Sequence, residues 1–402
     1  MPAAKGQTDI KAKASKMPPH PFALDPSEIQ SKLAETTTAI NKRFGAGTMD
    51  TAANKAADLT IHPLPTPSLK LNAILDGGFM EGRMIELFGK ESSGKTFLTY
   101  EVIAYDMKAY PGSVWLWCET EGSYNESDAK MMGVDTNRLH VTMLGDKGAE
   151  ELLDIMEAFI RQLSEVKGLL RGVVVNSVAG LTPVDELNTV HSQQHMGLQA
   201  RMMSKHMRKI NAIAHRTKCT IIYINQIREN IGAYGSPTTT SGGRALRFYS
   251  SQRIELRKAS ESKANWDTLR MMKIDVKVHK NRLSRTNPYK TTSMYAVYGQ
   301  GIDSGIEIAE LAVASGLIQR GGAWYTYKGQ KFNGNMKLLE YINTNPDIKQ
   351  ELYDTIYESF IRTTDINLNE QQAIQAAETA ETAEFNNIEY EEAVNADQLP
   401  IE

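Results

Sequence analysis

One stretch of the sequence decides the fold: Gly89-Lys90-Glu91-Ser92-Ser93-Gly94-Lys95-Thr96. It matches the pattern G-x-x-x-x-G-K-[ST], in which backbone N–H groups and a helix N-terminus hold phosphate groups. Residues 83–88 before it alternate like a short strand, and residues 96–104 after it carry apolar side chains at helical spacing. In such a loop the Lys95 ammonium reaches the β and γ phosphates, and the Thr96 hydroxyl binds Mg²⁺. The stretch therefore predicts a site for a nucleoside triphosphate and Mg²⁺.

Strand and helix signals alternate from about Leu59 to Tyr298. Short apolar runs with buried-strand character occur at 114–117, 172–175 and 219–224, and long helical segments at 149–166 and 197–216 separate them. Residues 270–279 and 291–298 alternate like further strands. This alternation is typical of an α/β fold with a mostly parallel central sheet and helices on both faces.

The chain divides further by composition. We predict a disordered N-terminus over residues 1–24 and a helix with a linker over residues 25–58, whose apolar side needs either its own core or a neighbouring subunit. Residues 59–300 are expected to form the α/β core, residues 301–362 a small α+β C-terminal domain, and residues 363–402 an acidic, disordered tail.

Composition favours a cytoplasmic protein that works without a membrane. No run approaches the roughly 18 apolar residues of a membrane span, and Cys118 and Cys219 lie too far apart in apolar segments to suggest a disulfide or metal site. Ten acidic residues follow Arg362, so the 45 basic residues face 38 acidic ones in residues 1–362. A basic body with an acidic tail suits a protein that handles a polyanion, and it equally suits a tail that only maintains solubility.

Polar side chains end three of the predicted strands. Glu119 and Glu121 follow the run at 114–117, Asn176 follows the run at 172–175, and Gln226 follows the run at 219–224. Ligands of open α/β sheets bind at the carboxyl ends of the strands. We therefore expect Glu119 and Asn176 to act on Mg²⁺ through water and Gln226 to contact the γ-phosphate. The alternatives are solvated loop acids and a buried glutamine without a ligand.

Several ordered motifs make the chain resemble the bacterial RecA-type recombinases from about Lys42 to Tyr357, and a phage-encoded member would carry the same motifs. They are Lys42-Arg43-Phe44-Gly45, Glu91-Ser92-Ser93-Gly94-Lys95-Thr96, Ser177-Val178-Ala179-Gly180-Leu181-Thr182-Pro183, His195-Met196-Gly197-Leu198, Ala200-Arg201-Met202-Met203-Ser204, Ile224-Asn225-Gln226-Ile227-Arg228, Gly242-Gly243-Arg244-Ala245-Leu246, Lys280-Asn281-Arg282 and Gly322-Ala323-Trp324-Tyr325.

The resemblance implies an ATP- and Mg²⁺-dependent catalytic site on a RecA-like phosphate-loop core. Glu121 resembles the family's catalytic glutamate, and Gln226 resembles its γ-phosphate sensor. Lys280 and Arg282 resemble the basic pair that reaches the ATP of a neighbouring subunit, in the manner of an arginine finger. Tyr298 resembles a family aromatic residue near the nucleotide. Two departures stand out: Asn176 replaces an aspartate, and Asp128 replaces an adenine-stacking tyrosine for which Tyr124 is a substitute.

The resemblance also implies two DNA-binding loops, at about 185–196 and 227–241. Met196 and Ile231 would be apolar wedges in the base stack. Six further residues would hold phosphates by charge and backbone N–H groups: Arg201, Ser204, Arg208, Arg228, Gly242 and Gly243. Arg201 and Arg208 share one helix face, which without the family context is also readable as a solvated face.

The implied function is an ATP-dependent recombinase that forms helical filaments on single-stranded DNA and exchanges strands with homologous double-stranded DNA. A single-stranded-DNA-binding protein and mediator proteins would be its partners. The first alternative is a DNA-coating filament that uses ATP binding as a switch with little hydrolysis, an idea supported by Asn176. The second is a ring-forming helicase, for which no dedicated motif is present.

Overall fold

The computed structural model describes residues 26–55, 60–145, 148–188, 197–229, 238–263, 270–282 and 289–359. The predicted disordered N-terminus and acidic tail, Met196 and Ile231 lie outside these residues. The chain forms two units, one up to Thr60 and one from Ile61 onward, and each is described by itself. None of the helices in the described part is long and apolar enough to span a membrane.

The first unit contains helix α1 (Pro26–Phe44), which confirms the helix predicted from the apolar spacing. Lys42 and Arg43 lie in its last turn, where positive charge favours the helix dipole. The helix ends at Gly45, whose φ of 114° suits glycine best. The apolar side chains of Leu33 and Phe44 are exposed within this unit. An exposed apolar side is what the sequence predicted for a helix that requires a partner.

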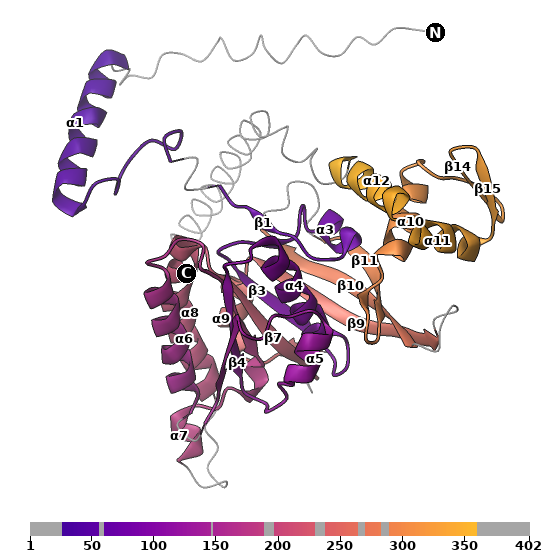
Figure 1. The fold of residues 1–402 in the computed structure, drawn as a ribbon. Coiled ribbons are helices and arrows are strands. Elements are labelled where there is room, and N and C mark those ends of the chain that lie inside the picture. The colour runs from indigo at the N-terminus through magenta and orange to yellow at the C-terminus, as the bar shows by residue number, and fades with distance from the viewer. Residues whose placement is uncertain are drawn as a thin grey trace, which may run out of the picture. The chain divides into compact units, whose positions relative to one another are not determined.

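The second unit is built on a large mixed sheet (Figure 1) with the strand order β12-β11-β10-β9-β3-β7-β6-β4-β5. Six neighbouring strands pair in parallel, which confirms the predicted α/β architecture. They are β5 (Leu139–Met143), β4 (Val114–Glu119), β6 (Leu170–Asn176), β7 (Thr220–Glu229), β3 (Met84–Gly89) and β9 (Gln252–Lys263). The antiparallel strands are β10 (Arg270–Asn281), β11 (Thr291–Val297), β12 (Gly301–Ile302) and β8 (Thr238–Thr240), which pairs with β7.

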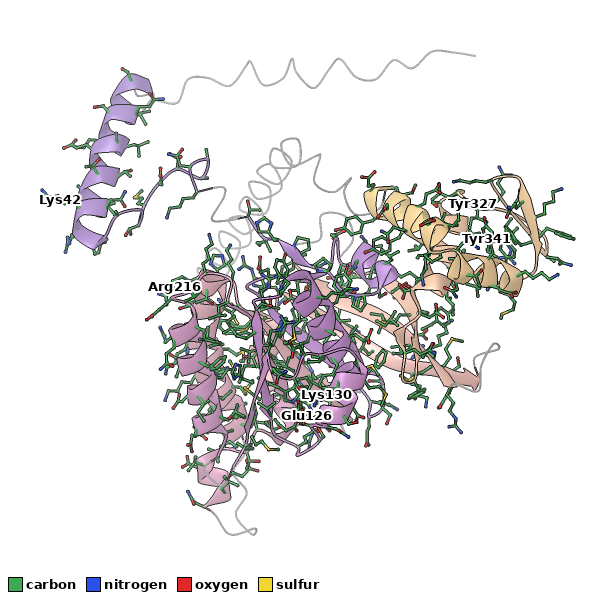
Figure 2. The ribbon with its side chains drawn as sticks, in the orientation of Figure 1. Lys42, Glu126, Lys130, Arg216, Tyr327 and Tyr341 are labelled. Carbon is green, nitrogen blue, oxygen red and sulfur yellow. The ribbon has the colours of Figure 1, made fainter. Side chains whose placement is uncertain are left out.

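Helices cover both faces of this sheet, and strand β4 shows why. Its alternate side chains enter two separate cores: Trp115 and Trp117 pack in one, and Leu116 and Cys118 in the other. The first core includes side chains of α4 (Lys95–Ala109) and α5 (Glu126–Met131), and the second those of α6 (Ala149–Leu163), α8 (Leu198–Thr217) and α9 (Gly243–Tyr249). Figure 2 shows the side chains on this ribbon, including the exposed i,i+4 ion pair of Glu126 and Lys130 on α5 (2.7 Å).

A third core lies in the C-terminal part. It is formed by α10 (Ser304–Ala314), α11 (Asn335–Thr344), α12 (Pro346–Tyr357) and a small antiparallel sheet of β13 (Gln319–Gly321), β14 (Trp324–Tyr327) and β15 (Gln330–Asn333). Leu69 of α3 (Leu69–Ile74) packs into it, and the Ser68 hydroxyl donates to the buried Glu307 carboxylate (2.8 Å). Residues 301–302 pair with β11 as the last strand of the large sheet, so the large sheet extends just past the predicted boundary at residue 300.

Both predicted DNA loops are shorter in the structure than in the sequence-based prediction. Strand β7 continues to Glu229 and pairs with β8, so residues 227–229 and 238–240 form a ribbon. Residues 185–187 belong to the short helix α7 (Val184–Leu187). The sequence pattern missed the ribbon because its polar residues are typical of turns, whereas pairing with a neighbouring strand overrides that preference.

Candidate active site at the carboxyl ends of the parallel strands

The phosphate-binding loop connects β3 to α4 and is tightly packed from behind. A Cβ atom at position 89 would lie 2.2 Å from the Leu256 carbonyl oxygen, and one at position 94 would lie 2.6 Å from the Ile274 Cδ1 atom. Gly94 also has a φ of 90° as the N-cap of α4. Both glycines are therefore required by space or backbone conformation, and they hold the exposed Lys90, Glu91 and Ser92 over the start of the helix. Figure 1 shows α4 leading away from this end of β3.

The Lys95 ammonium folds back onto this loop. Its Nζ donates to the Gly89 carbonyl (3.2 Å), the Lys90 carbonyl (2.7 Å) and more distantly the Ser93 hydroxyl (3.4 Å). Burial lowers the pKa of Lys95, while the charges of Glu121 and Glu91 oppose that shift. A buried cation held by neutral oxygens is well suited to bind an incoming phosphate. Thr96, the predicted Mg²⁺ ligand, is the second residue of the helix.

Glu121 and Gln226 meet at the same edge of the sheet. The Gln226 Nε2 donates to the Glu121 Oε1 at 2.9 Å, and the Ser177 hydroxyl donates to the same oxygen. The pairing of β3 with β7 sets Gln226 opposite Gly89, the first residue of the phosphate-binding loop. The structure thus brings together the two side chains that the sequence predicted as catalytic glutamate and γ-phosphate sensor, and the exposed Glu121 faces solvent.

Glu119 is buried and holds the turn that carries Glu121. Its Oε1 accepts from the backbone N–H of Glu121 (2.8 Å), and its Oε2 accepts from the Trp117 indole (2.9 Å) and the Asn176 amide nitrogen (3.1 Å). The Asn176 nitrogen also donates to the Ser123 hydroxyl (3.1 Å). Both Glu119 oxygens therefore serve the protein. Of Glu119 and Asn176, Asn176 is therefore the better candidate to face a metal-bound water, because its side-chain bonds to Glu119 and Ser123 both use the amide nitrogen.

Tyr298 and Tyr124, the two aromatic residues considered for the nucleotide, lie in different surroundings. The Tyr298 hydroxyl contacts the Met272 sulfur (3.9 Å), and the Met272 methyl lies 3.4 Å from the Cβ position of Gly94. Met272 thus lies between Tyr298 and the phosphate-binding loop, and the role of Tyr298 at the nucleotide stays a prediction. Tyr124 instead packs into an aromatic group, with ring centroids 6.1 Å from Trp117 and 6.5 Å from Tyr100. Asp128 is exposed on α5.

Lys280 and Arg282 do not join this cluster. Lys280 pairs with Arg253 and so lies level with Glu86, two strands aside and about 10 Å short of Gly89 along the sheet. Its ammonium donates to the carbonyls of Arg247 (2.8 Å) and Phe248 (2.9 Å), and the Arg282 guanidinium also donates to Phe248 (2.8 Å). Burial, with the charges of Arg282 and Arg253, lowers the pKa of Lys280 to about 8. The hydrogen bonds of both side chains therefore hold the end of α9 and not the phosphate-binding loop.

The predicted DNA contacts that the structure describes lie on α8, α9 and the end of β7. Arg201 and Arg208 are exposed on α8 and Ser204 is half-buried between them, while the Arg228 guanidinium donates to the Ser241 hydroxyl (3.1 Å). Gly242 and Gly243 begin α9 with φ angles of 85° and 73°. A Cβ at position 243 would lie 2.8 Å from the Ala200 Cβ, so the starts of α8 and α9 pack closely.

Two polar residues in this region were missed by the sequence analysis as parts of the site. The Asn225 side chain donates to Glu86 and to the Ser241 carbonyl (both 2.9 Å), and the abrupt polar end of its strand was a signal for it. Gln199 donates to the carbonyls of Val178 (2.9 Å) and Leu181 (3.0 Å) and accepts from the Gly242 N–H (3.2 Å). No local pattern distinguishes Gln199 from a solvated helix residue.

No cluster of three or more His, Cys, Asp or Glu side chains suited to a metal occurs in the described part of the chain. Magnesium at nucleotide sites is usually held by one or two protein oxygens together with substrate phosphates and water. Thr96 and the end of β6 fit such a site.

The comparisons with known proteins agree with this geometry. Residues 31–303 match the family model described as the RecA N-terminal domain, and residues 306–361 match the RecA C-terminal domain. Curated proteins named Protein RecA are similar over most of their length. That of Dichelobacter nodosus is 37% identical over 83% of this chain and 93% of its own, and that of Mycoplasma mycoides is 38% identical over 81% and 91%. That of Acinetobacter baylyi is 36% identical over 82% and 91%.

Proposed function

The chain belongs to the RecA family, and from that premise we propose that the carboxyl edge of its parallel strands binds and hydrolyses ATP with Mg²⁺ during homologous pairing. As a member of this family it is a recombinase of recombination and repair and a DNA-dependent ATPase. The proposal concerns which residues perform this activity. The observation that carries it is the contact of Gln226 with Glu121 beside the phosphate-binding loop.

The loop residues 89–96 bind the triphosphate, and Lys95 supplies the charge. On binding, the Lys95 ammonium exchanges the carbonyls of Gly89 and Lys90 for phosphate oxygens, which a charge-assisted bond favours. Magnesium, when bound, neutralises charge on the transferring phosphoryl group. Thr96 would hold it directly, with Asn176 and, less directly, Glu119 acting through water. Tyr298 would lie against the nucleotide.

Glu121 positions the attacking water, and Gln226 reports the γ-phosphate. In the structure the Gln226 amide and the Ser177 hydroxyl both hold the Glu121 carboxylate. A γ-phosphate within reach of Gln226 competes for that amide. Glu121 would then turn one oxygen toward water, as a general base or orienting group requires.

Lys280 and Arg282 act on the ATP of the neighbouring subunit. Their distance from the phosphate loop of their own chain leaves action in trans as the way to reach a nucleotide, and a head-to-tail filament supplies such a neighbour. Helix α1, with its exposed apolar residues, is the proposed filament contact.

Single-stranded DNA would lie along Arg201, Ser204, Arg208 and Arg228 and the starts of α8 and α9, with Met196 and Ile231 as wedges. Homologous duplex is the second DNA partner. We place the activity in the cytoplasm of a bacterium or of a phage-infected host, because the named relatives are bacterial.

Strand exchange between single-stranded DNA and a labelled homologous duplex tests the function. Glu121→Gln should retain ATP-dependent filaments while phosphate release falls about 100-fold or more, because the positioned carboxylate is lost. Glu126→Gln, on the exposed face of α5, is the matched control and should behave like the wild type. The DNA-coating alternative, favoured by Asn176, predicts filaments with hardly any phosphate release even in the wild type.

Action in trans has its own test. Glu121→Gln and Arg282→Ala should each be inactive alone, because one lacks the water-positioning group and the other lacks the neighbour's charge. Mixed in equal amounts, they should recover about a quarter of the wild-type turnover, since random assembly places an intact site beside an intact Arg282 at that frequency. No recovery in mixed filaments would argue against the assignment of Arg282.

A further inference from the structure

Gln199 joins three elements that converge beside the active site. It lies in the first turn of α8 and is half-buried. Its Nε2 donates to the carbonyls of Val178, the first residue of the short 3₁₀ helix η2 (Val178–Gly180), and of Leu181, the C-cap of η2. Its Oε1 accepts from the N–H of Gly242, the N-cap of α9. Both amide hydrogens and the amide oxygen are thus engaged.

These bonds close a ring that passes through the nucleotide sensor. From Gly242 the chain leads back to Ser241, whose carbonyl accepts from the Asn225 amide (2.9 Å), while the Asn225 oxygen accepts from the Gln226 N–H (2.9 Å). The Gln226 side chain reaches Glu121, and the Ser177 hydroxyl, one residue before Val178, reaches the same carboxylate. Gln199 is the link that joins the two halves of this ring.

We propose that Gln199 is a positioning residue that couples the sensor Gln226 to the starts of α8 and α9, from which the proposed DNA contacts Arg201, Ser204 and Gly243 project. This rests on the proposed function. A movement of the Gln226 amide toward a γ-phosphate changes what holds Glu121 and Ser177. Gln199 transmits that change because it fixes the backbone after Ser177 to the backbone before α9. Hydrogen bonds in a partly buried ring strengthen one another, so the loss of one bond weakens the remaining bonds of the ring.

A purely structural role for Gln199 makes a different prediction. If it only secures the 3₁₀ turn, its removal lowers stability and weakens DNA binding equally with and without nucleotide. A coupling role changes the ratio of the two affinities instead, because coupling is a difference between states.

The test measures the dissociation constant for fluorescent single-stranded DNA with a non-hydrolysable ATP analogue and without nucleotide. The ratio of the two constants is the coupling factor. Gln199→Ala should reduce that factor by between about 2-fold and about 30-fold, the range in which network residues modulate coupling. Gln162→Ala, on the exposed side of α6, is the matched control and should leave the factor unchanged.

Gln199→Met keeps the side-chain length without the polar atoms and decides the matter if the alanine variant does not fold. A coupling factor equal to the wild-type value in a folded Gln199 variant would overturn the inference. A wild-type protein that binds single-stranded DNA with the same affinity in both nucleotide conditions would overturn the proposed function itself, so the two failures are distinguishable.

Discussion

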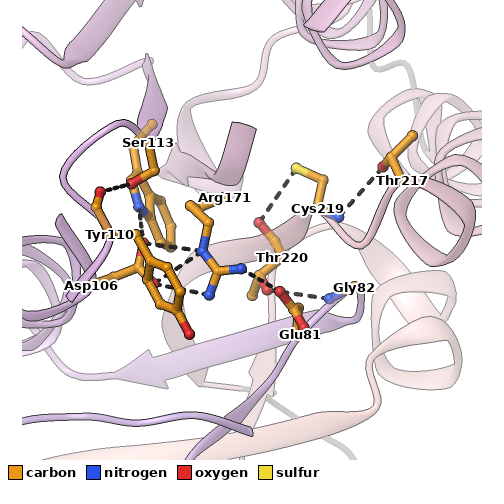
Figure 3. Close-up of polar contacts among 10 residues, drawn as sticks. Glu81, Gly82, Asp106, Tyr110, Ser113, Arg171, Thr217, Cys219 and Thr220 are labelled. Atoms are coloured by element: carbon orange, nitrogen blue, oxygen red, sulfur yellow. Dashed lines mark hydrogen bonds and ion pairs between the residues drawn. The ribbon is translucent and has the colours of Figure 1, made fainter. Parts of the chain in front are cut away.

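The two ends of the parallel sheet use buried charge in opposite ways, and helix α4 connects them. At the carboxyl end, Lys95 opens the helix and its ammonium rests on neutral carbonyls. About 16 Å further along, Asp106 of the same helix meets Arg171 of β6 in a closed ion-pair group (Figure 3). At the carboxyl end the Lys95 charge has neutral hydrogen-bond partners, whereas at the other end the Arg171 charge is paired with two carboxylates.

The Arg171 group shows what a saturated site looks like. Its guanidinium donates to Asp106 (3.0 and 3.1 Å) and to Glu81, and it lies 4.1 Å from the ring centroid of Tyr110 (Figure 3). Asp106 also accepts from the Trp115 indole (2.9 Å). The Arg171 guanidinium already contacts two carboxylates and an aromatic ring, so the protein itself satisfies its charge. The comparison teaches that buried charge marks a functional site here only where the protein itself leaves it unpaired.

The largest expected effect breaks the saturated end. Arg171→Met should lower the free energy of unfolding by about 3–5 kcal/mol, because Asp106 and Glu81 would be left without their cation. Urea unfolding measures the loss. Arg161→Met, which removes a partly exposed pair with Glu157, is the control and should cost at most about 1 kcal/mol. Hydrolysis per folded molecule should stay near the wild-type value, and a fall beyond about tenfold in Arg171→Met would contradict a purely structural role.

The complementary change breaks the open end. Lys95→Met should reduce phosphate release by about 10²–10³-fold, because a preorganised charge at the transferring phosphoryl group is lost. Since burial lowers the pKa of Lys95, the apo protein should unfold at the same temperature or a higher one. Phosphate-release kinetics and calorimetry on one preparation check both halves. A loss of stability as large as that of Arg171→Met would show that the two ends do not differ in the way described.

Glu307 is a third kind of buried charge-bearing group, an acid whose hydrogen-bond donors are a hydroxyl and a backbone N–H. Ser68 and the Lys70 N–H donate to it, the Lys70 and Glu310 charges lie nearby, and burial raises its pKa to about 7. The folded state therefore keeps a proton that the unfolded state loses near pH 4.5, so the contribution of Glu307 to stability falls as the pH rises from 4.5 through 7 and is constant above that. Glu307→Gln should gain about 3 kcal/mol relative to the wild type between pH 4.5 and pH 7.5.

Urea unfolding of both proteins across that pH range gives the difference directly. Glu101, whose pKa burial also raises to about 7, titrates in both proteins and cancels in the comparison. A difference between Glu307→Gln and the wild type that is constant with pH would refute the assignment.

The smallest effect concerns the bond between Asn176 and Glu119. Asn176→Asp replaces an amide donor with a second carboxylate 3.1 Å from the first, which should cost about 2 kcal/mol of stability without Mg²⁺. At low Mg²⁺ the same change should raise turnover, because the added charge attracts the cation. Unfolding and hydrolysis across a Mg²⁺ titration test this, with Asn335→Asp at the exposed start of α11 as control. An unchanged Mg²⁺ dependence would count against a metal role for position 176.

The sequence predicted the parts of the site that local rules determine. The loop at 89–96, the strand before it and the polar ends at Glu121 and Gln226 follow from motif and periodicity, because parallel strands bring their carboxyl ends to one edge. Their mutual contact spans β6, which lies between β4 and β7, so it depends on the strand order as well as on the shared edge. The α/β architecture and helix α1 were also predicted, because alternating apolar runs and helical apolar spacing are visible in the sequence itself.

Other features depend on register and packing, which one sequence does not reveal. Nothing local places Lys280 level with Glu86, away from the loop, since that position follows from the pairing of β10 with β9 and of β9 with β3. The triple contact of Gln199 likewise arises only when α8, η2 and α9 converge. Glu119 was predicted to act on Mg²⁺ through water. Its bonds to the Glu121 N–H, Trp117 and Asn176 add a role in holding the turn that carries Glu121, which the sequence does not reveal.

The measurement that tests the central claim most directly is ATP hydrolysis by the purified protein, with and without single-stranded DNA, across a Mg²⁺ titration. The proposed coupling of Gln226 to the DNA contacts predicts slow turnover without DNA and much faster turnover on DNA, with the stimulation lost in Glu121→Gln. Equal rates with and without DNA at every Mg²⁺ concentration would contradict a DNA-gated active site at this edge of the sheet.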